Sequence, residues 1–309
     1  KIIIMKKILV FGSNGLVGNS LKRILDKNEF NIKFSTREDT NLFSLEETQN
    51  TINEFQPDII INAAAKVGGI HANSSQRSEF LLENLKINMN ILESCIKNKN
   101  ILIVNLGSSC IYPLNAENPI KEDSIMSGML EPTNSPYAMA KLTAIELANS
   151  LNLQFGHKVL NLMPTNLYGP NDNFSEMDSH VIPGLIFRMH NAKINEQEQF
   201  SIWGTGKPLR EFMHVDDLAK AILFLINRTP EESLINIGSG EEISIENLSN
   251  LIKEIVGFDG DLIFDSQMPD GNPRKLLDSS LINNLGWSPE IDLRSGIKLT
   301  YDWFLENIS

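Results

Sequence analysis

A glycine-rich turn directly follows the first apolar run of the chain, and it constrains the fold more than any other feature. The segment reads Lys7-Ile-Leu-Val-Phe-Gly12-Ser-Asn-Gly15-Leu16-Val17-Gly18. The apolar run predicts a strand buried on both faces, as in a parallel sheet. The three glycines allow a tight turn, close approach of the backbone to a pyrophosphate, and close packing of a helix on the strand. The helix that begins at Leu16 and Val17 would direct its free N–H groups at the phosphates, so the turn predicts dinucleotide binding.

The end of the second expected strand, residues 31–35, indicates which dinucleotide is bound. In NAD-binding proteins an acidic residue here holds the ribose 2′-hydroxyl. This chain has Thr36-Arg37 instead, and Arg37 suits the 2′-phosphate of NADP. Asp39 follows slightly later and leaves NAD as the minor alternative. The other interpretation of Arg37 is a solvated surface arginine without a ligand.

Apolar strands and amphipathic helices alternate from residue 7 to about residue 170. This alternation predicts an α/β fold, a doubly wound parallel sheet of the Rossmann type with right-handed crossovers, and a smaller C-terminal α/β lobe. We expect the nucleotide-binding domain over residues 5–170 with a return segment at about 211–240, and the lobe over residues 171–210 and 241–309. The expected strands are 8–11, 32–35, 59–62, 102–106 and 159–163.

Three further elements are expected in the last third of the chain. Residues 212–227 are interpreted as a helix that is entered through Asp216-Asp217, and residues 234–238 as a short strand. Ser244 is expected to begin a helix that runs to Val256, where Gly257 ends it.

Tyr137 and Lys141 lie four residues apart, about thirty residues after Ser108. On a helix this spacing places both side chains on one face. A tyrosine with its ordinary pKa of about 10 is a poor acid or base near pH 7. The lysine charge is expected to lower the pKa of Tyr137, and Ser108 would hydrogen-bond the same substrate oxygen. The Tyr-x-x-x-Lys pattern is weak alone, but the glycine turn upstream makes it a strong indication of oxidoreductase chemistry.

Composition excludes several classes of function. The 309 residues carry a net charge of −12, which argues against nucleic acid or an anionic membrane as a partner. Cys95 and Cys110 are the only cysteines, so a disulfide framework is implausible and a reducing cytoplasm is expected. No metal-ligand cluster and no apolar run of about 20 residues is visible. The opening Lys1-Ile-Ile-Ile is too short for a secretory signal.

Together these segments resemble the extended short-chain dehydrogenases/reductases and, within that superfamily, the GDP-L-fucose synthase family. The resemblance covers nearly the whole chain. The Tyr/Lys pair and the glycine turn define only the superfamily, whereas two segments are much more specific, Ser108-Ser-Cys-Ile-Tyr-Pro113 and Ser179-His-Val-Ile-Pro183. The other segments that carry it are Ala63–Ile70, Glu131–Asn134, Met163–Pro170, Trp203–Gly206, Arg210–Asp217 and Pro269–Asp278.

The resemblance implies an NADPH-dependent enzyme that converts GDP-4-keto-6-deoxy-D-mannose to GDP-L-fucose by inverting C3 and C5 and reducing C4. Cys110 and His180 would transfer the protons of epimerisation, with their acid and base roles left open. Because Cys110 stands two residues after Ser108 at a strand end, both side chains are expected on one side of the strand. Tyr137, supported by Lys141, would protonate the new alkoxide. A buried core cysteine and a structural loop histidine are the alternative interpretations.

The resemblance also assigns binding residues. Lys141, Asn166 and His180 would contact the cofactor. Arg188, Arg210 and Lys275 would bind the GDP moiety, with Trp203 as an apolar wall. The family often carries a basic residue inside the glycine turn, where this chain has Ser13-Asn14, so Arg37 would hold more of the NADP phosphate. No metal is implied, and a homodimer is expected.

Two alternatives stay open. One is a GDP-L-colitose synthase, which would use the same residues on a 3,6-dideoxy-4-keto sugar and invert only C5. The other is a nucleotide-binding module of the same fold without catalysis. The presence of all five residues that the chemistry needs argues against the second alternative; they are Ser108, Cys110, Tyr137, Lys141 and His180.

Overall fold

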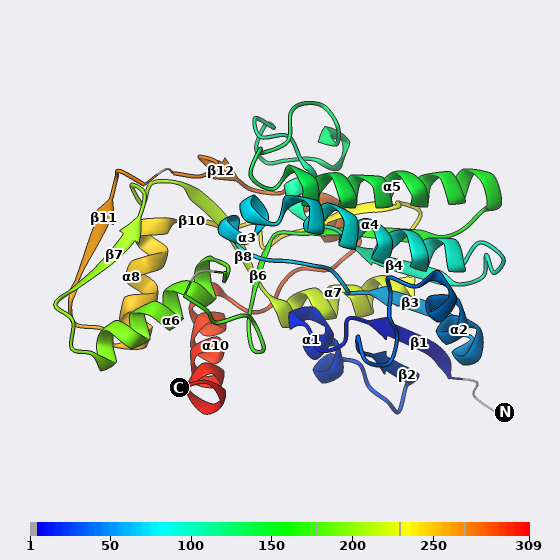
Figure 1. Cartoon of the computed structure of the whole chain (residues 1–309), viewed down its shortest axis with the longest axis horizontal. Helices are drawn as coiled ribbons and strands as arrows, with labels where there is room; N and C mark the ends of the chain where they lie inside the picture. The colour runs from blue at the N-terminus through cyan, green and yellow to red at the C-terminus, as the bar shows by residue number, and fades with distance from the viewer. Residues whose placement is uncertain (1–4, 177, 229, 269) are drawn as a thin grey trace.

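The structure, a computed structural model, describes residues 5–176, 178–228, 230–268 and 270–309. The opening Lys1-Ile-Ile-Ile therefore lies outside the described residues. Six parallel strands form the main sheet in the order β2-β1-β3-β4-β5-β9 (Figure 1). The predicted α/β fold of the Rossmann type is thus confirmed. The strands are β1 (Lys6–Phe11), β2 (Phe30–Ser35), β3 (Ile59–Asn62), β4 (Leu102–Leu106), β5 (Val159–Pro164) and β9 (Leu234–Ile237).

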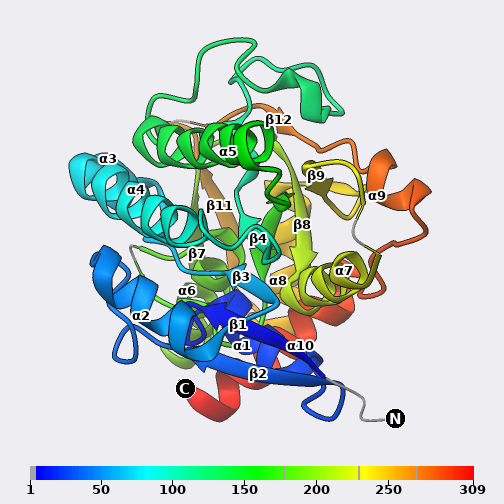
Figure 2. The same ribbon diagram turned by 90° about the vertical axis from the view of Figure 1, so that its right-hand side faces the viewer.

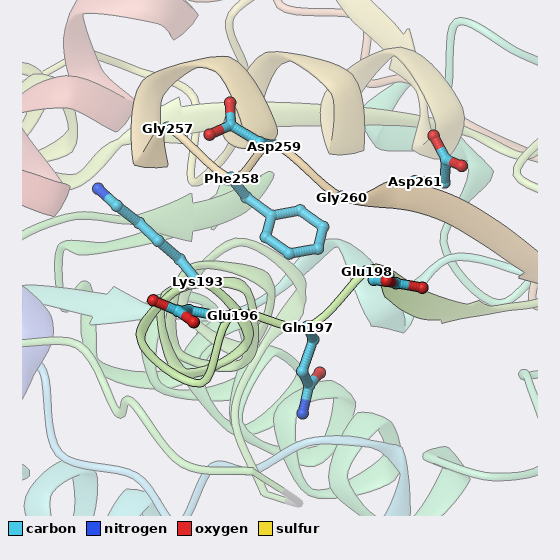
Figure 3. A pocket seen from close by; sticks show the side chains of 9 residues that line it. All are labelled: Lys193, Glu196, Gln197, Glu198, Gly257, Phe258, Asp259, Gly260 and Asp261. Atoms are coloured by element: carbon cyan, nitrogen blue, oxygen red, sulfur yellow. The ribbon is translucent and has the colours of Figure 1, made fainter.

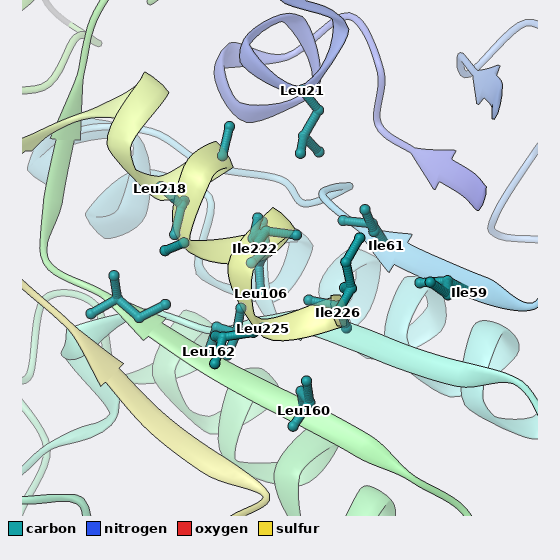
Figure 4. Close-up of a cluster of buried hydrophobic side chains, with 14 of the residues drawn as sticks. Leu21, Ile59, Ile61, Leu106, Leu160, Leu162, Leu218, Ile222, Leu225 and Ile226 are labelled. Carbon is teal, nitrogen blue, oxygen red and sulfur yellow. The ribbon is translucent and has the colours of Figure 1, made fainter. Parts of the chain in front are cut away.

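Helices cover both faces of this sheet because successive strand residues point to opposite sides. Ile8 and Val10 of β1 pack in a core with α1 (Leu16–Ile24) and α7 (Val215–Arg228). Leu9 and Phe11 pack in a second core against α2 (Leu45–Phe55), α4 (Arg77–Ser94) and α5 (Ser135–Phe155). Figures 2 and 4 show the two helix layers and the α7 side chains that face the strands. The central strands are therefore mostly apolar on both faces, as a doubly covered parallel sheet requires.

A row of buried amides crosses the centre of the sheet. Asn62 Nδ2 donates to Asn105 Oδ1 at 3.0 Å, and Asn105 Nδ2 donates to Asn161 Oδ1 at 3.2 Å. The three residues are register partners on β3, β4 and β5. Asn62 also donates to Asn88 on α4. This ladder satisfies polar groups that would otherwise be costly to bury, and it ties α4 to the sheet.

A smaller lobe lies beyond the carboxyl ends of the main strands (Figure 1). Its core is formed by α6 (Val181–Ile194), α8 (Ile245–Val256) and α10 (Leu293–Asn307) with the strands beside them. One sheet contains β6 (Asn166–Tyr168), β8 (Leu209–His214), β10 (Glu242–Ser244) and β12 (Arg274–Lys275). Another pairs β7 (Gln199–Trp203) with β11 (Asp261–Asp265). The short helices are α3 (Ile70–Ser75), α9 (Ser280–Asn284), η1 (Ser109–Ile111) and η2 (Glu122–Ser124).

The predictions for the last third of the chain have mixed outcomes. The helix from Ser244 to Val256 is confirmed, with Ser244 as its N-cap and Gly257 in the left-handed conformation after it. The helix expected over residues 212–227 is wrong at its start, because Phe212–His214 belongs to β8 and α7 begins at Val215. The β8 residues pair with β6, which local sequence does not reveal. Among the described residues, no helix is both long and apolar enough to cross a membrane.

Candidate active site

The glycine turn joins β1 to α1 in a geometry that larger residues would disrupt. Gly12 has φ of 75°, and a Cβ there would lie 2.6 Å from the backbone of Ala64. A Cβ on Gly18 would lie 2.3 Å from the carbonyl oxygen of Gly12. A Cβ on Gly15 would meet only one atom, at an ordinary 3.5 Å. Gly12 and Gly18 therefore serve packing within the turn, whereas Gly15 leaves the space above the helix end open.

The N-terminus of α1 is suited to a phosphate group. Gly15 is its N-cap and provides no side-chain acceptor for the first helical N–H groups. The N–H groups of Leu16, Val17 and Gly18 have no partner one turn earlier in the helix, and the helix dipole places partial positive charge there. Because β1 and β3 are neighbours at the point where the strand order reverses, this helix end opens into the crevice where such folds bind nucleotides. The turn fits the pyrophosphate of a dinucleotide.

The end of β2 has the chemistry for a 2′-phosphate. Arg37 is exposed, two residues after the strand ends. The carboxylate of Asp39 is turned away into its own loop, where it accepts from Thr36 N at 2.8 Å and from Thr36 Oγ1 at 2.7 Å. These hydrogen bonds lower the pKa of Asp39. One oxygen of the carboxylate that could have held an NAD ribose diol is thus already engaged.

Tyr137 and Lys141 lie on the first two turns of α5 and face the end of β4. Lys141 is 2% exposed; its Nζ donates to the carbonyl oxygen of Leu106 at 2.7 Å and lies 5.7 Å from the centroid of the Tyr137 ring. The Tyr137 ring packs edge-on against Phe80 of α4, with centroids 6.4 Å apart. The helix spacing therefore places the pair together as expected.

The expected electrostatic effect on Tyr137 is wrong in direction. Burial raises the pKa of the Tyr137 phenol above its ordinary value and lowers the pKa of Lys141 to about 8. Desolvation disfavours the charged form of both groups and is the largest cause of both shifts. The phenol is consequently a proton donor at neutral pH, which is the form that a general acid needs.

Ser108 and Cys110 lie close together, although not for the reason given by strand alternation. Strand β4 ends at Leu106, and Ser109–Ile111 forms the single turn η1, with Ser108 as its N-cap. Ser108 Oγ accepts from Cys110 N at 3.4 Å. Cys110 is 7% exposed, and burial raises the pKa of its thiol, while the charges of Lys275 and Lys141 oppose that rise. A tight turn, not an extended strand, brings the two side chains to one place.

His180 is the N-cap residue of α6, and its ring makes no capping hydrogen bond. The loop before it is fastened to the segment after β3, because Gly69 N donates to the carbonyl oxygen of Asp178 at 3.1 Å. The side chain is accessible from outside, yet the surrounding protein lowers the pKa of the imidazole by desolvation. A neutral imidazole at pH 7 has a lone pair that can accept a proton.

The substrate residues expected as one basic cluster divide into two groups. Arg188 and Trp203 line a cavity of about 520 Å³ with Glu176, Phe187 and Asn191. The Arg188 guanidinium lies 5.4 Å from the centroid of the Phe200 ring, and Trp203 is 57% exposed. This cavity combines an aromatic wall, a cation and amide groups, which suits a nucleotide base and its ribose.

Arg210 and Lys275 form the second group, as register partners on the parallel strands β8 and β12. The guanidinium of Arg210 donates to the carbonyl oxygens of Leu209 and Asn272. Burial lowers the pKa of Lys275, and among its charged neighbours the thiol of Cys110 acts most strongly on it. Lys275 is therefore part of the centre around Cys110, and not of the cavity beside Arg188.

Sequence reasoning missed Glu211, a completely buried carboxylate that follows Arg210 on β8. Its Oε1 accepts from Gly240 N at 2.8 Å and its Oε2 accepts from Leu277 N at 3.1 Å. Its backbone carbonyl accepts from Asn166 Nδ2 at 2.8 Å. Glu211 therefore connects β8, the loop after β9 and the segment that carries Lys275. Strand alternation next to Arg210 is the signal that could have placed Glu211 inward.

A second cavity, of about 460 Å³, is lined by residues at and after the C-terminal ends of α6 and α8 in the smaller lobe, and Figure 3 shows these residues. Phe258 and Lys193 line it together with four carboxylates. Lys193 Nζ donates to the carbonyl oxygen of Val256 and so caps the end of α8. An acidic lining repels an anionic nucleotide, so this cavity is not part of the proposed site.

The model of the NAD dependent epimerase/dehydratase family matches residues 8–238. The chain therefore belongs to that family. Within it, the sequence is 46% identical to GDP-L-fucose synthase 1 of Arabidopsis thaliana, over 98% of this chain and 94% of that protein. It is 41% identical to GDP-L-fucose synthase of Escherichia coli (strain K12), over 98% and 97%. It is 36% identical to GDP-L-colitose synthase of Yersinia pseudotuberculosis, over 97% and 98%. The resemblance to the GDP-L-fucose synthases is confirmed.

Solved structures agree with these relatives. A GDP-6-OMe-4-keto-L-xylo-heptose reductase from C. jejuni superposes with a TM-score of 0.91 at 32% identity, over 98% of both chains. A GDP-L-fucose synthetase from Naegleria fowleri bound to NADP superposes with a TM-score of 0.87 at 29% identity, over 98% of this chain and 94% of that chain.

Proposed function

We propose that this protein is an NADPH-dependent enzyme that converts GDP-4-keto-6-deoxy-D-mannose to GDP-L-fucose, by epimerisation at C3 and C5 and reduction at C4. The observation that carries the proposal is the convergence of Ser108, Cys110, Tyr137, Lys141 and Lys275 at the carboxyl end of β4. The phenol of Tyr137 could donate a proton to an alkoxide, and the separate thiol of Cys110 could exchange protons with the carbon atoms next to a ketone. A reductase without epimerase activity needs only the proton donor.

Most of the residues that would bind NADPH lie in the first half of the chain. Gly12, Gly15 and the N–H groups of Leu16, Val17 and Gly18 would hold the pyrophosphate, and Arg37 the 2′-phosphate. Lys141, Asn166 and His180 would hold the nicotinamide end. Residues 5–170 with the return segment 211–240 would thus bind NADPH, and residues 171–210 and 241–309 the nucleotide sugar. When bound, NADPH supplies the hydride that reduces the C4 carbonyl.

Epimerisation uses the acidity of the C–H bonds next to the C4 ketone. Removal of the proton at C3 or C5 leaves an enolate whose oxygen Ser108 and Tyr137 would stabilise by hydrogen bonds. Cys110 and His180 would remove and return protons on opposite faces of the sugar ring. Their shifted pKa values leave a thiol that can donate a proton and an imidazole that can accept one. Lys275 would favour the thiolate whenever the thiol transfers its proton.

Reduction needs a proton for the oxygen at C4. Tyr137 would donate it, because burial keeps the phenol protonated. The ammonium of Lys141, fixed on the carbonyl oxygen of Leu106, would stabilise the phenolate that remains. Arg210 would neutralise the diphosphate, and the cavity between Arg188 and Trp203 would receive the guanosine. The two groups of substrate residues thus correspond to the two ends of one GDP-sugar.

A single assay tests this function. The protein is incubated with NADPH and GDP-4-keto-6-deoxymannose in deuterated water, and the product is identified by NMR. We expect oxidation of NADPH, with deuterium at C3 and C5 of a GDP-L-fucose product. Absence of NADPH oxidation with this sugar would contradict the proposal and favour the binding module. Faster turnover of the 3,6-dideoxy sugar, with inversion at C5 alone, would favour the GDP-L-colitose synthase instead.

We also propose a homodimer formed through α4 and α5. Exposed apolar side chains lie seven residues apart on α4, at Leu82 and Met89, and fourteen residues apart on α5, at Met139 and Leu153. Residues seven apart lie on nearly the same face of a helix. Two copies related by a two-fold axis would cover both stripes. Sedimentation of the wild type as a dimer, and of Leu82→Glu/Met89→Glu as a monomer, is expected; a monomeric wild type would overturn this assignment.

A further inference from the structure

Lys22 lies in the last turn of α1, yet its ammonium reaches back to the glycine turn. Lys22 Nζ donates to Asn14 Oδ1 at 2.9 Å and lies 5.9 Å from the centroid of the Phe34 ring. Phe34 is the penultimate residue of β2, and the next residue, Ser35, accepts from Ser13 N at 3.2 Å. The ammonium is therefore held where the glycine turn meets the end of β2.

The charge of Lys22 is not neutralised by its neighbours. Its two contacts are a neutral amide and an aromatic ring. The adjacent cation, Arg23, is paired with Asp216 at 2.6 Å. In the part of the chain that the structure describes, neither Lys22 nor Arg37 has a carboxylate within 4.0 Å. Two exposed cations without carboxylate partners thus flank the end of β2.

We propose that Lys22 is a second ligand of the 2′-phosphate of NADP, oriented by Asn14, and that it supplies the charge that the glycine turn lacks. This inference rests on the proposed NADPH-dependent function. In this fold the residues after β2 receive the 2′ position of the adenosine ribose. A phosphate there gains from a compact ammonium as well as from a guanidinium fork. A 2′-hydroxyl gains little binding free energy from either cation, so Lys22 distinguishes NADPH from NADH.

Asn14 has a defined part in this arrangement. Its Oδ1 accepts from Lys22, which leaves the two N–H bonds of its Nδ2 free to donate to a phosphate oxygen. An aspartate at this position would pair with Lys22 and repel the phosphate. Asn14→Asp should therefore weaken the binding of NADPH more than Lys22→Gln does, although aspartate has nearly the same size and shape as asparagine.

The test measures the dissociation constants of NADPH and NADH by calorimetry for the wild type, Lys22→Gln and Asn14→Asp. Lys27→Gln serves as the matched control, because Lys27 is an exposed lysine just beyond the same helix. We expect Lys22→Gln to raise the dissociation constant of NADPH roughly five- to twentyfold and that of NADH less than about twofold. The effect on NADPH is moderate because solvent partly screens exposed charges. Lys27→Gln should change neither constant, and added salt should reduce the NADPH effect.

Two kinds of failure can be told apart. If the wild type binds no NADPH, the proposed function fails. If the wild type binds NADPH but Lys22→Gln leaves its dissociation constant unchanged, or weakens both cofactors equally, the role of Lys22 is overturned and the function stands. Circular dichroism of each variant shows whether it folds. Should Lys22→Gln fail to fold, the uncharged Lys22→Met is used instead, and an unaltered ratio of the NADPH and NADH constants in that variant would overturn the proposal.

Discussion

The cofactor end and the catalytic end of the site hold positive charge in opposite ways. Lys22 and Arg37 stand in solvent at the end of β2. Lys141 and Lys275 are enclosed near Cys110, and burial lowers the pKa of both. An exposed cation costs the fold little and is worth little until an anion binds, whereas an enclosed cation is costly and acts strongly on groups beside it. Substitutions should therefore change affinity alone at the first end, but activity and stability together at the second.

The largest effect is expected for Tyr137→Phe at the catalytic end. Removal of the proton donor should lower the rate of NADPH oxidation by about 10²- to 10⁴-fold, as for other general acids. The ketone and its acidic neighbours remain and Ser108 can still hydrogen-bond the enolate oxygen, so some exchange of deuterium into C3 and C5 should continue, at a reduced rate. Stopped-flow absorbance and NMR measure the two processes separately. Loss of both to the same extent would mean that Tyr137 positions the sugar for every step.

Cys110→Ser should have the reverse outcome. It retains nearly the same volume but replaces a thiol, which in an ordinary cysteine has a pKa of about 8.5, with a hydroxyl that hardly ionises. We expect deuterium exchange at C3 and C5 to fall by about 10²-fold or more, while the directly reduced, unepimerised 6-deoxy sugar still forms. NMR of the product identifies it. Exchange at the normal rate would make Cys110 a packing residue and would remove the pairing with His180.

Lys141→Met tests the cost of an enclosed charge. The pKa of Lys141 falls from 10.5 to about 8 on folding, which corresponds to roughly 3 kcal/mol against the charged form. Because the folded pKa lies below the unfolded one, this penalty is fully present below about pH 8 and disappears as pH rises to about 10.5. The variant should lose reductase activity. At pH 7 it should nevertheless unfold at a higher denaturant concentration than the wild type, and this gain in stability should shrink above pH 8. A destabilised variant at pH 7 would show that the hydrogen bond to Leu106 outweighs the burial of charge.

Arg37→Ala should give the smallest effect of the four and should not alter stability. A charge-assisted fork on phosphate is worth roughly 1.5–3 kcal/mol, or about ten- to a hundredfold in affinity for NADPH. NADH should be weakened far less, and the denaturant midpoint should stay unchanged. Calorimetry and denaturant titration measure the two quantities. Equal losses for both cofactors would reduce Arg37 to a structural role and would remove the distinction between the two ends.

The cofactor end could be predicted mostly from the sequence because it is local. β1, the glycine turn and α1 are contiguous. The alternation of strands and helices predicted five of the six strands of the main sheet, and the sixth was predicted separately over residues 234–238. Tyr137 and Lys141 are likewise four residues apart on one helix. In each case the relation between residues depends on the geometry of a single strand, turn or helix, which short-range sequence specifies.

The catalytic end depends on contacts between distant residues. Lys275 lies beside Cys110 although 165 positions separate them in the sequence. The sequence predicts segment 212–214 as the start of the helix over residues 212–227, whereas its pairing with β6 makes it part of a strand. The buried carboxylate of Glu211 follows from the same long-range pairing, since its partners come from the loop after β9 and from Leu277.

The sequence by itself therefore determined the fold class, the glycine turn, the choice of Arg37 over an acidic residue, and the helical Tyr/Lys pair. The tertiary structure alone decided the direction of the pKa shifts at Tyr137 and Cys110, and the division of the basic residues into two groups. The physical reason is that desolvation depends on every atom packed around a group, whatever its position in the sequence. Dihedral preferences and hydrophobic period are carried by neighbouring residues, but burial is a property of the assembled chain.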